Sequence, residues 1–346
     1  MIPLSKPYFI WLKIAVVLAA FYLLSKVTPI YLPIILAVVF AFIINPLVNH
    51  LVRLRIGGRS LVPHSLAVAL SIVVAIGVLA AIVGFIFSPF VSEFNRLVVN
   101  LPGLIQKIQA LTGRLEEQAN SINLPANIRL MIDQILSSAA SYAVTIGRRA
   151  LGATVGFASQ VVELVVVPVL TYYFLKDWRE LKLSTLEALP PDWRDKGRVI
   201  VEEMAATVSG YIRGQAVVSV VMGCLAFAGM YFLGVDYPLV FGLLTALTET
   251  IPIIGPIIGA APAVFLAYLA APELAVKVVI FFLMIQQIEN HIIVPKVMGK
   301  SIDLHPVTVI ISLLIGGQLM GVVGMILAVP AAALLKVLYR HLWHYE

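Results

Sequence analysis

The chain has 346 residues, of which 61% are hydrophobic and only 12% are charged, and its mean hydropathy is +1.01. Soluble domains carry about 25% charged residues, so this composition excludes an ordinary soluble protein and indicates an integral membrane protein. The net charge of +6 comes without a long basic run or an arginine-rich arm, which argues against a nucleic-acid partner. The single cysteine, Cys224, excludes an intrachain disulfide framework and any multi-cysteine metal site.

Long apolar segments predict an all-α fold, a polytopic integral membrane protein with about eight transmembrane segments. A helix needs about 20 predominantly apolar residues to cross the bilayer. The continuous candidate spans are 10–27, 30–50, 64–89, 150–175, 211–234 and 274–295. The candidates interrupted by glycine and proline are 238–271 and 304–339.

Basic residues near the predicted span ends indicate the orientation of the chain. Lys6 and Lys13 precede the first apolar run, and no small-residue cleavage site leads to polar sequence after it, so we expect an uncleaved first span. The short loop with Arg53, Arg55 and Arg59 is expected in the cytoplasm by the positive-inside rule. The N- and C-termini are then both predicted to be cytoplasmic.

Two regions are too polar to cross the membrane and are predicted to form extramembrane amphipathic helices. The first has leucine and isoleucine at helical spacing among charged residues, and the second is dense in charges of both signs, which is typical of a solvated face. The predicted organisation is 1–89, N-terminal transmembrane helices; 90–148, an extracytoplasmic helical segment; 149–176, a transmembrane helix; 177–209, a cytoplasmic charged segment; and 210–346, a transport core with broken helices.

Two stretches, ETIPIIGPIIGAAP at 249–262 and IGGQLMGVVG at 315–324, interrupt apolar sequence with glycine and proline. Broken helices survive in a membrane only where they are buried in protein or line a wet cavity, because free backbone groups are costly in hydrocarbon. Paired broken segments therefore indicate a transporter's binding site, in re-entrant or discontinuous helices. The alternative is a kinked helix whose glycines pack closely on a neighbour. The candidate pathway residues here are Pro252, Gly255, Pro256, Gly259, Gly317, Gln318 and Gly321.

Polar residues inside apolar segments supply further candidates, because ionisable groups in a membrane are expensive and usually functional. Glu249 lies at the start of the first break and is predicted to take up a proton, unless it lies at the membrane interface. The run 286–291 adds Gln287, Glu289, Asn290 and His291 to the predicted pathway, unless it is a helix end at the cytoplasmic face. On a regular helix Gln286, Glu289 and Asn290 would share one face.

Glu163 is the one charged residue in the apolar run around it, and it is a candidate relay together with Arg213. The alternative is a structural carboxylate paired with Arg213 or Gln215. The sequence contains no phosphate-binding loop GxxxxGK[ST], no GxSxG elbow and no HExxH motif. We therefore expect no enzymatic activity, no cofactor and no bound metal.

Several motifs follow one another in the order seen in a known family. They are FLKD at 174–177, LPP at 189–191, GYIRGQ at 210–215, PIIGPIIGAAPA at 252–263, ENHIIVPKVMGKS at 289–301, LHP at 304–306 and IGGQLMGVVGMILAVPA at 315–331. Over essentially its whole length, and most closely over 170–335, the chain resembles the autoinducer-2 exporter family of bacterial and archaeal membrane proteins.

The resemblance implies a permease of the prokaryotic plasma membrane with about eight spans, assembled as a homo-oligomer such as a pentamer. Family members are linked to export of the quorum-sensing signal autoinducer-2, and others to Na⁺(Li⁺)/H⁺ antiport. The sequence thus predicts a transporter for a small polar solute, passive or driven by an ion gradient, whose partners are the lipid bilayer and that solute. The alternatives are a monovalent-cation/proton antiporter that uses an intramembrane glutamate, and a membrane scaffold or sensor.

Overall fold

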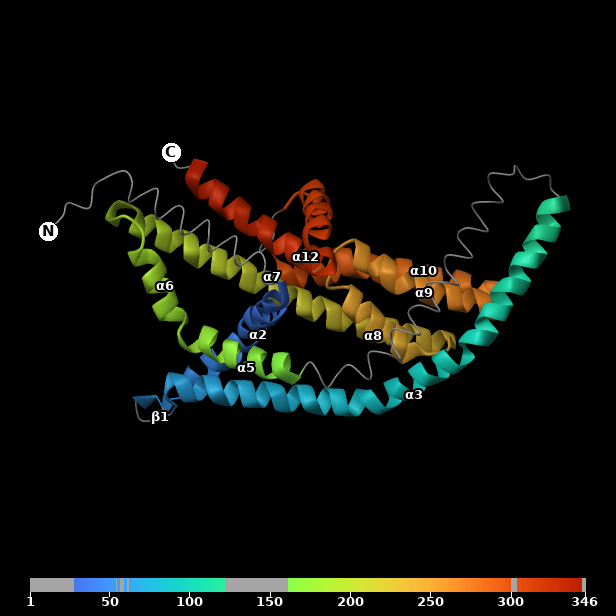
Figure 1. The fold of residues 1–346 in the computed structure, drawn as a ribbon, viewed down its shortest axis with the longest axis horizontal. Helices are drawn as coiled ribbons and strands as arrows, with labels where there is room; N and C mark the ends of the chain where they lie inside the picture. The colour runs from blue at the N-terminus through green and yellow to red at the C-terminus, as the bar shows by residue number, and fades with distance from the viewer. Residues whose placement is uncertain are drawn as a thin grey trace. The chain divides into compact units, whose positions relative to one another are not determined.

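The computed structural model describes residues 28–53, 55–56, 59–60, 62–121, 161–299 and 304–343, and these are almost entirely helical (Figure 1). The predicted all-α fold is confirmed. The elements are α2 (Thr28–Arg53), β1 (Arg55–Ile56), β2 (Arg59–Ser60), α3 (His64–Ser121), α5 (Val161–Lys176), α6 (Trp178–Glu187), α7 (Pro191–Leu233), α8 (Pro238–Thr248), α9 (Ile254–Ala270), α10 (Pro272–Ile288), the π-helical turn η2 (Glu289–Ile293), α11 (Val294–Met298) and α12 (Pro306–Trp343). The two short strands pair with each other as an antiparallel hairpin.

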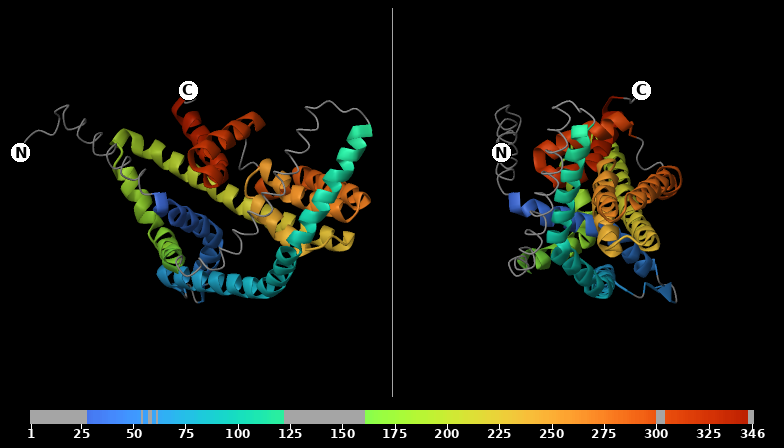
Figure 2. Two further views of the ribbon diagram at one scale, coloured as in Figure 1. Left: turned by 45° about the vertical axis from the view of Figure 1, so that its right-hand side comes forward. Right: turned by 90° about the vertical axis from the view of Figure 1, so that its right-hand side faces the viewer.

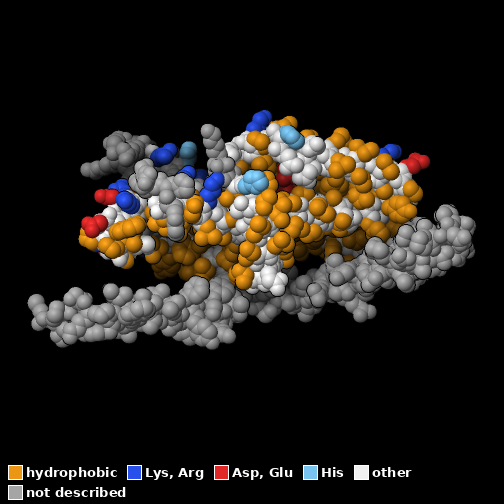
Figure 3. Space-filling view, turned by 90° about the horizontal axis from the view of Figure 1, so that it is seen from above, with side chains coloured by type: hydrophobic (Ala, Val, Ile, Leu, Met, Phe, Trp, Pro, Cys, Tyr) orange, Lys and Arg blue, Asp and Glu red, His pale blue; other side chains and the backbone are white. Residues whose placement is uncertain are grey.

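Five of the described helices are long and apolar enough to cross a membrane, which agrees with the predicted multi-pass protein. They comprise Leu32–Arg53, His64–Asn100, Pro191–Leu233, Pro272–Met298 and Pro306–Leu342, and three shorter apolar helices accompany them. Large hydrophobic side chains are exposed along these helices, and Figure 3 shows a face on which they cover most of the described surface. Such a surface suits lipid contact. The predicted span 10–27 and the first part of 150–175 lie outside the described residues.

The chain divides into two compact units, of which the first contains α2, the start of α3, and α5. In this unit α2 packs against α5, and the Thr171 hydroxyl donates hydrogen bonds to the carbonyls of Ala37 at 3.3 Å and Val167 at 2.8 Å. Ala37 and Ala67 are fully buried. Small residues at such positions let helix backbones approach closely within a membrane.

Two predicted boundaries fall inside continuous helices. Helix α3 runs from His64 to Ser121, whereas the predicted span ends at residue 89 and a separate helical segment is predicted from residue 90. Pro89 and Pro102 lie inside α3, and the helix bends in its second half in Figure 1, as proline allows when it removes a backbone donor. Similarly, α7 continues through residue 209, where the predicted charged segment ends.

The second unit contains the rest of α3 and the elements from α7 to α12. Helix α7 packs against α8, α10, α11 and α12, and α9 packs against both α8 and α10 (Figure 2). The pairing of α7 with α8 is a seam of small residues, in which Gly223 faces Gly242 and Ala246, and Gly242 faces Phe227. At the far end of α7, Glu203 forms ion pairs with Arg340 and His341 of α12.

Both predicted interruptions are present as reversals between helical limbs, so the broken helices are confirmed. The first reversal occupies Glu249 to Ile253 between α8 and α9, and Ile253 has a left-handed φ of +68°. It is shorter than predicted, because α9 already includes Pro256 and Pro262. Pro256 lies in the first turn of α9, where a missing N–H has no intrahelical acceptor anyway, whereas Pro262 lies inside the helix.

The second reversal lies inside α12, where the backbone leaves helical geometry at Met320 and Gly321. Gly321 has φ +60° and ψ −136°, a conformation that glycine adopts without a steric penalty. The two limbs meet closely at Gly316 and Gly324, each of which faces the carbonyl of the other. Leu313 and Ala328, one on each limb, pack against Ile251 of the first reversal.

Candidate functional site

A stripe of buried polar residues runs along one face of the C-terminal half of helix α7, where most of the sequence is apolar. Tyr211, Gln215 and Ser219 are spaced four residues apart, so they share a face, and all three side chains are buried. The hydroxyls of Tyr211 and Ser219 have no hydrogen-bond partner among the described residues. Buried polar groups are nearly always satisfied, and those that are not call for a ligand, a water or a functional explanation.

The facing helix α8 ends at a second pair of buried polar residues, Thr245 and Glu249, which are both only 1% exposed. The last carbonyls of a helix lack intrahelical donors, and Gln215 supplies one: its side-chain amide donates to the Glu249 carbonyl at 2.5 Å. Within the described part of the chain, Thr245 Oγ1 and Glu249 Oε2 have no donor or acceptor partner.

The third element of the site is the π-helical turn η2, which begins with Glu289. The Gln286 side-chain amide donates to Glu289 Oε2 at 2.8 Å, and Glu289 is 7% exposed. The carboxyl groups of Glu289 and Glu249 are close neighbours in this buried region and interact electrostatically. A carboxylate only accepts hydrogen bonds, so a bond between two carboxyls requires a proton on one of them. We call Glu249 and Glu289 the carboxyl pair.

The seam between α7 and α8 brings the hydroxyls of Ser219 and Thr245 to the same region as the carboxyl pair. The helices are antiparallel, with Gly223 against Ala246 and Gln215 against Glu249. Ser219 lies one turn from each of these α7 residues, and Thr245 lies one turn before Glu249. Oxygen atoms from two helices and the η2 turn therefore line one buried region of the second unit.

A family model described as the AI-2E family transporter matches residues 11–343. The chain belongs to the AI-2E family of transporters. It is 29% identical to YueF of Bacillus subtilis (strain 168) over an alignment of 353 residues, which covers 98% of this chain and 94% of YueF. It is 27% identical to the AI-2 transport protein TqsA of Escherichia coli (strain K12) over 312 residues, 89% of this chain and 85% of TqsA. It is also 38% identical to YrrI of Bacillus subtilis over 175 residues, about half of each chain.

Two glycines predicted to lie on the pathway of this AI-2E transporter, Gly255 and Gly259, bring backbones together beside the carboxyl pair. A Cβ at Gly255 would collide with the carbonyl of Thr248 and lie 3.1 Å from the Glu249 Cα. A Cβ at Gly259 would lie 3.1 Å from Thr245 Oγ1. Because these glycines have no side chains, α9 can lie against the end of α8. This region therefore contains both the predicted interruption and the close glycine packing that was the alternative to it.

The polar run 286–291 divides between two faces. Glu289 is buried and Gln286 is half-buried, whereas Gln287, Asn290 and His291 are exposed. The prediction that Asn290 shares the face of Glu289 assumes regular helical spacing, and the wider π turn changes that register. The His291 ring contacts the Gln287 carbonyl at 3.0 Å on the outer face.

The remaining predicted residues of the AI-2E transporter lie away from the carboxyl pair or outside the described part. Gln318 and Gly321 are exposed at the reversal of α12, and Gly317 is partly buried there. Arg213 is exposed on α7, with its Nε donating to the Ser209 carbonyl at 3.1 Å. The side chain of Glu163 lies outside the described residues, so its predicted relay role is not addressed by the structure.

The predicted pathway lacks four residues of the site, Tyr211, Gln215, Ser219 and Thr245; of these, Tyr211 and Gln215 enter the prediction only within the GYIRGQ motif, and Gln215 also as a possible partner of Glu163. Their signal is the four-residue spacing of polar side chains within an apolar helix, which places the first three on a single face. No group of three or more histidine, cysteine, aspartate or glutamate residues suited to a metal ion occurs in the described ranges. The chemistry available to this AI-2E transporter at the site is therefore that of two carboxyls surrounded by hydroxyl and amide groups.

Proposed function

We propose that this AI-2E family member is an ion-coupled transporter in which the carboxyl pair binds a proton or a monovalent cation. The observation that carries the proposal is the proximity of the buried carboxyls of Glu249 and Glu289, with Glu249 Oε2 lacking a donor in the described part of the chain. Two neighbouring carboxylates repel each other, and the burial of Glu249 and Glu289 removes the water that would screen this repulsion.

The pair can be neutralised in two ways, and these compete. A proton bridges the two carboxyls and leaves one negative charge, whereas Na⁺ or Li⁺ binds both carboxylates once the proton has left. Oxygen ligands suit such hard cations. Because the proton and the cation need the same carboxylate oxygens, loading one releases the other, and this competition is the basis of Na⁺(Li⁺)/H⁺ antiport.

A second candidate function is export of autoinducer-2 or a similar small polar solute, in which the carboxyl pair supplies the coupling to an ion gradient. It is favoured by the similarity to TqsA, whose name describes an AI-2 transport protein. Gln287 and Asn290 on the exposed face of the 286–291 run, and Gln318 at the reversal of α12, offer amide groups that suit a hydroxyl-rich, uncharged solute. Under either function the chain acts as a carrier and not as an enzyme.

The proposed membrane location, orientation and oligomeric state of the transporter are those predicted from the sequence. We expect a multi-pass protein of a prokaryotic plasma membrane with both termini in the cytoplasm, in keeping with Arg53 at the end of α2 and Arg340 near the end of α12. We also expect a homo-oligomer, since the exposed hydrophobic surface offers area for contacts between copies as well as with lipid.

Ion flux in proteoliposomes tests the proposal. The purified protein is reconstituted with a pH-sensitive dye inside, and an inward Na⁺ or Li⁺ gradient is applied, with labelled autoinducer-2 measured in parallel. We expect cation-driven proton efflux that falls about tenfold or more in Glu249→Gln and Glu289→Gln, since each substitution removes an ionisable group from the intramembrane site. Glu273→Gln is the matched control, because Glu273 is an exposed glutamate of the neighbouring helix α10.

The possible outcomes separate the candidates. Autoinducer-2 flux without Na⁺- or Li⁺-driven proton movement would favour the second function, and ion coupling would then appear only as a pH dependence of that flux. Full cation-driven proton flux in both glutamine variants would refute the role of the carboxyl pair. No flux of any kind from the unmodified protein would support a scaffold or sensor.

A further inference from the structure

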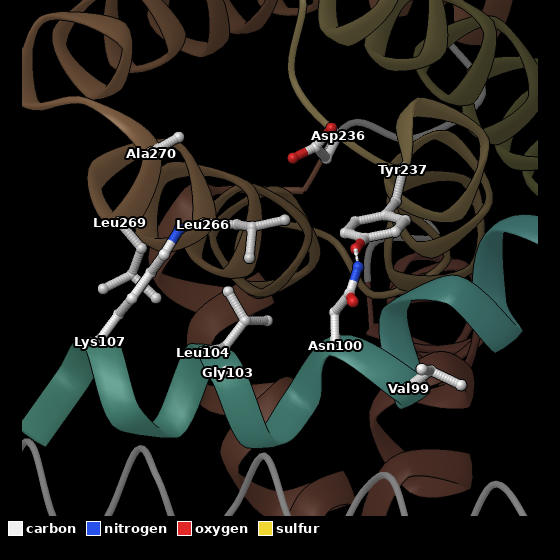
Figure 4. Close-up of a pocket in the computed structure, with 10 residues that line it drawn as sticks. All are labelled: Val99, Asn100, Gly103, Leu104, Lys107, Asp236, Tyr237, Leu266, Leu269 and Ala270. Carbon is white, nitrogen blue, oxygen red and sulfur yellow. Dashed lines mark hydrogen bonds between the residues drawn. The ribbon is translucent and has the colours of Figure 1, made fainter.

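A cavity of about 290 Å³ lies in the second unit, beside the loop that follows the C-terminal end of α7 (Figure 4). Its walls come from one face of α3, the loop between α7 and α8, and the C-terminal end of α9. The volume is near the lower end of the range for ligand pockets, which is about 300–1,000 Å³, so the cavity suits a small solute. It is separate from the carboxyl pair, whose residues do not line it.

Specific polar contacts hold the walls of this cavity together. Glu93 of α3 accepts hydrogen bonds from the first free N–H groups of α8, at Leu239 (2.9 Å) and Val240 (3.3 Å). A carboxylate at a helix N-terminus is favourable because it meets unsatisfied N–H groups and the positive end of the helix dipole. The Asn100 side-chain amide of α3 donates to the Tyr237 hydroxyl at 2.7 Å.

Tyr237 closes one side of the cavity with a strained backbone. Its φ of +60° and ψ of +47° are left-handed, which is uncommon for a residue with a side chain. Residues held in such conformations cluster at ligand-binding and active sites, where the surrounding structure maintains them. Figure 4 shows the Tyr237 ring and Asn100 on one side of the space and the Lys107 side chain on the other.

The cavity wall carries one cation and one anion, both on exposed residues, and no ion pair of the described residues includes either of them. They are Lys107 of α3 and Asp236 of the α7–α8 loop, which both line the space. Both side chains extend toward the cavity in Figure 4. The surface between them is apolar, with Leu104 and Leu266 facing inward from opposite walls.

We propose that this cavity binds a small zwitterion with an apolar side chain, of the amino-acid type. The ligand carboxylate pairs with the Lys107 ammonium, the ligand ammonium pairs with the Asp236 carboxylate, and the apolar side chain packs on Leu104 and Leu266. Charge-assisted hydrogen bonds at both ends fix the orientation of the ligand, and the leucines select against polar side chains. A neutral, hydroxyl-rich solute would leave both charges unpaired.

The predicted orientation places this site on the extracytoplasmic side, because the α7–α8 loop lies at the opposite end of α7 from the predicted cytoplasmic segment. A ligand there meets the protein from outside the cell. Binding at this cavity does not depend on the proposed ion coupling, since it involves neither glutamate of the carboxyl pair.

The test is binding of three matched probes to the full-length protein purified in detergent, measured by isothermal titration calorimetry. L-leucine carries both charges, L-leucinamide lacks the carboxylate, and 4-methylpentanoate lacks the ammonium group. We expect L-leucine to bind and each analogue to bind about tenfold more weakly or worse, which corresponds to one lost charge-assisted hydrogen bond. D-ribose serves as the neutral, hydroxyl-rich probe and is expected not to bind.

Substitutions of Lys107 and Asp236 test whether L-leucine binds in this cavity. Lys107→Gln and Asp236→Asn are each expected to weaken L-leucine binding about tenfold or more, for the same lost contact. The exchanged double variant Lys107→Asp/Asp236→Lys is expected to regain binding, since the zwitterion can bind in the reverse direction. This rescue also shows that the single variants had not simply misfolded. Lys277→Gln, at an exposed lysine of α10, is the matched control and is expected to bind as the unmodified protein does.

The proposal is overturned if L-leucine does not bind, whether or not D-ribose binds. It is also overturned if the two analogues bind as tightly as L-leucine. Equal binding of L-leucine by the unmodified protein and both single variants would also overturn it. Failure of these binding tests would leave the ion-flux experiment on the carboxyl pair unaffected.

Discussion

Gly255→Ala tests whether the first reversal depends on the close approach of α9 to the end of α8. The added Cβ would collide with the carbonyl of Thr248 and lie 3.1 Å from the Glu249 Cα. These are backbone atoms, so the collision is relieved only if the two helices move apart. Overpacking of this kind typically costs about 1–3 kcal/mol, and a rigid backbone neighbour places the variant near the upper end.

Replacing glycine by alanine inside a helix also contributes about 0.5–1 kcal/mol of stability, which opposes the collision. We therefore expect a net loss of about 2 kcal/mol in the free energy of unfolding, seen as a fall of a few degrees in the thermal midpoint. Because Glu249 would move with the end of α8, the cation-driven proton flux proposed for the carboxyl pair is expected to fall as well.

Thermal unfolding of the detergent-purified protein provides the measurement, with Gly77→Ala as the matched control. Gly77 lies inside α3 with no atom within 4 Å of the position of its Cβ, so its replacement carries no collision. We expect the control to match or slightly exceed the unmodified protein. If Gly255→Ala unfolds at the same temperature as Gly77→Ala, the close contact is absent and the reasoning about this reversal fails.

Three further substitutions test other contacts. Gln215→Leu leaves the buried Glu249 carbonyl without its donor and is expected to cost about 1–3 kcal/mol of stability, and an unchanged thermal midpoint would contradict this contact. Glu93→Ala removes the acceptor for the first N–H groups of α8 and is expected to cost about 1 kcal/mol. Hydrogen exchange at Leu239 and Val240 should then accelerate, and identical exchange would show that Glu93 does not cap α8. Gly324→Ala places a Cβ against the carbonyl of Gly316 and is expected to cost about 1–3 kcal/mol of stability. Gly84→Ala is its control, because no atom lies within 4 Å of that Cβ position. Equal thermal midpoints for the two variants would mean that the two limbs of α12 are farther apart.

The main features of the fold are predictable because their causes are local in sequence. The length of an apolar run determines whether a helix can cross the bilayer, and glycine and proline mark where a helix is interrupted. The sequence therefore predicts interruptions near Pro252 and Gly321 without fixing how the chain threads there, and the structure shows a reversal at each. It does not predict the continuity of α3, since two prolines and a change to charged residues suggest a boundary that the backbone bridges by bending.

The candidate site is only partly predictable, because it depends on contacts between residues far apart in sequence. Glu249 and Glu289 each stand out as acids in apolar sequence, but nothing local indicates that they lie close to each other. The role of Gln215 is likewise invisible until α7 and α8 are paired. Asn290 and His291 are predicted at the site through regular helical spacing, and the π turn directs them outward instead.

The carboxyl pair is produced by departures from regular helix geometry, and this argues that it is not an incidental contact. Glu249 occupies the point where α8 ends, and Glu289 occupies the first position of η2. Helix ends and π turns carry a cost in unsatisfied or poorly aligned backbone bonds, and π turns occur frequently at functional sites. Two neighbouring buried acids add a further cost. An apolar residue at either position would avoid the cost of the two buried acids, so their retention supports the proposal that the pair binds and releases a charge.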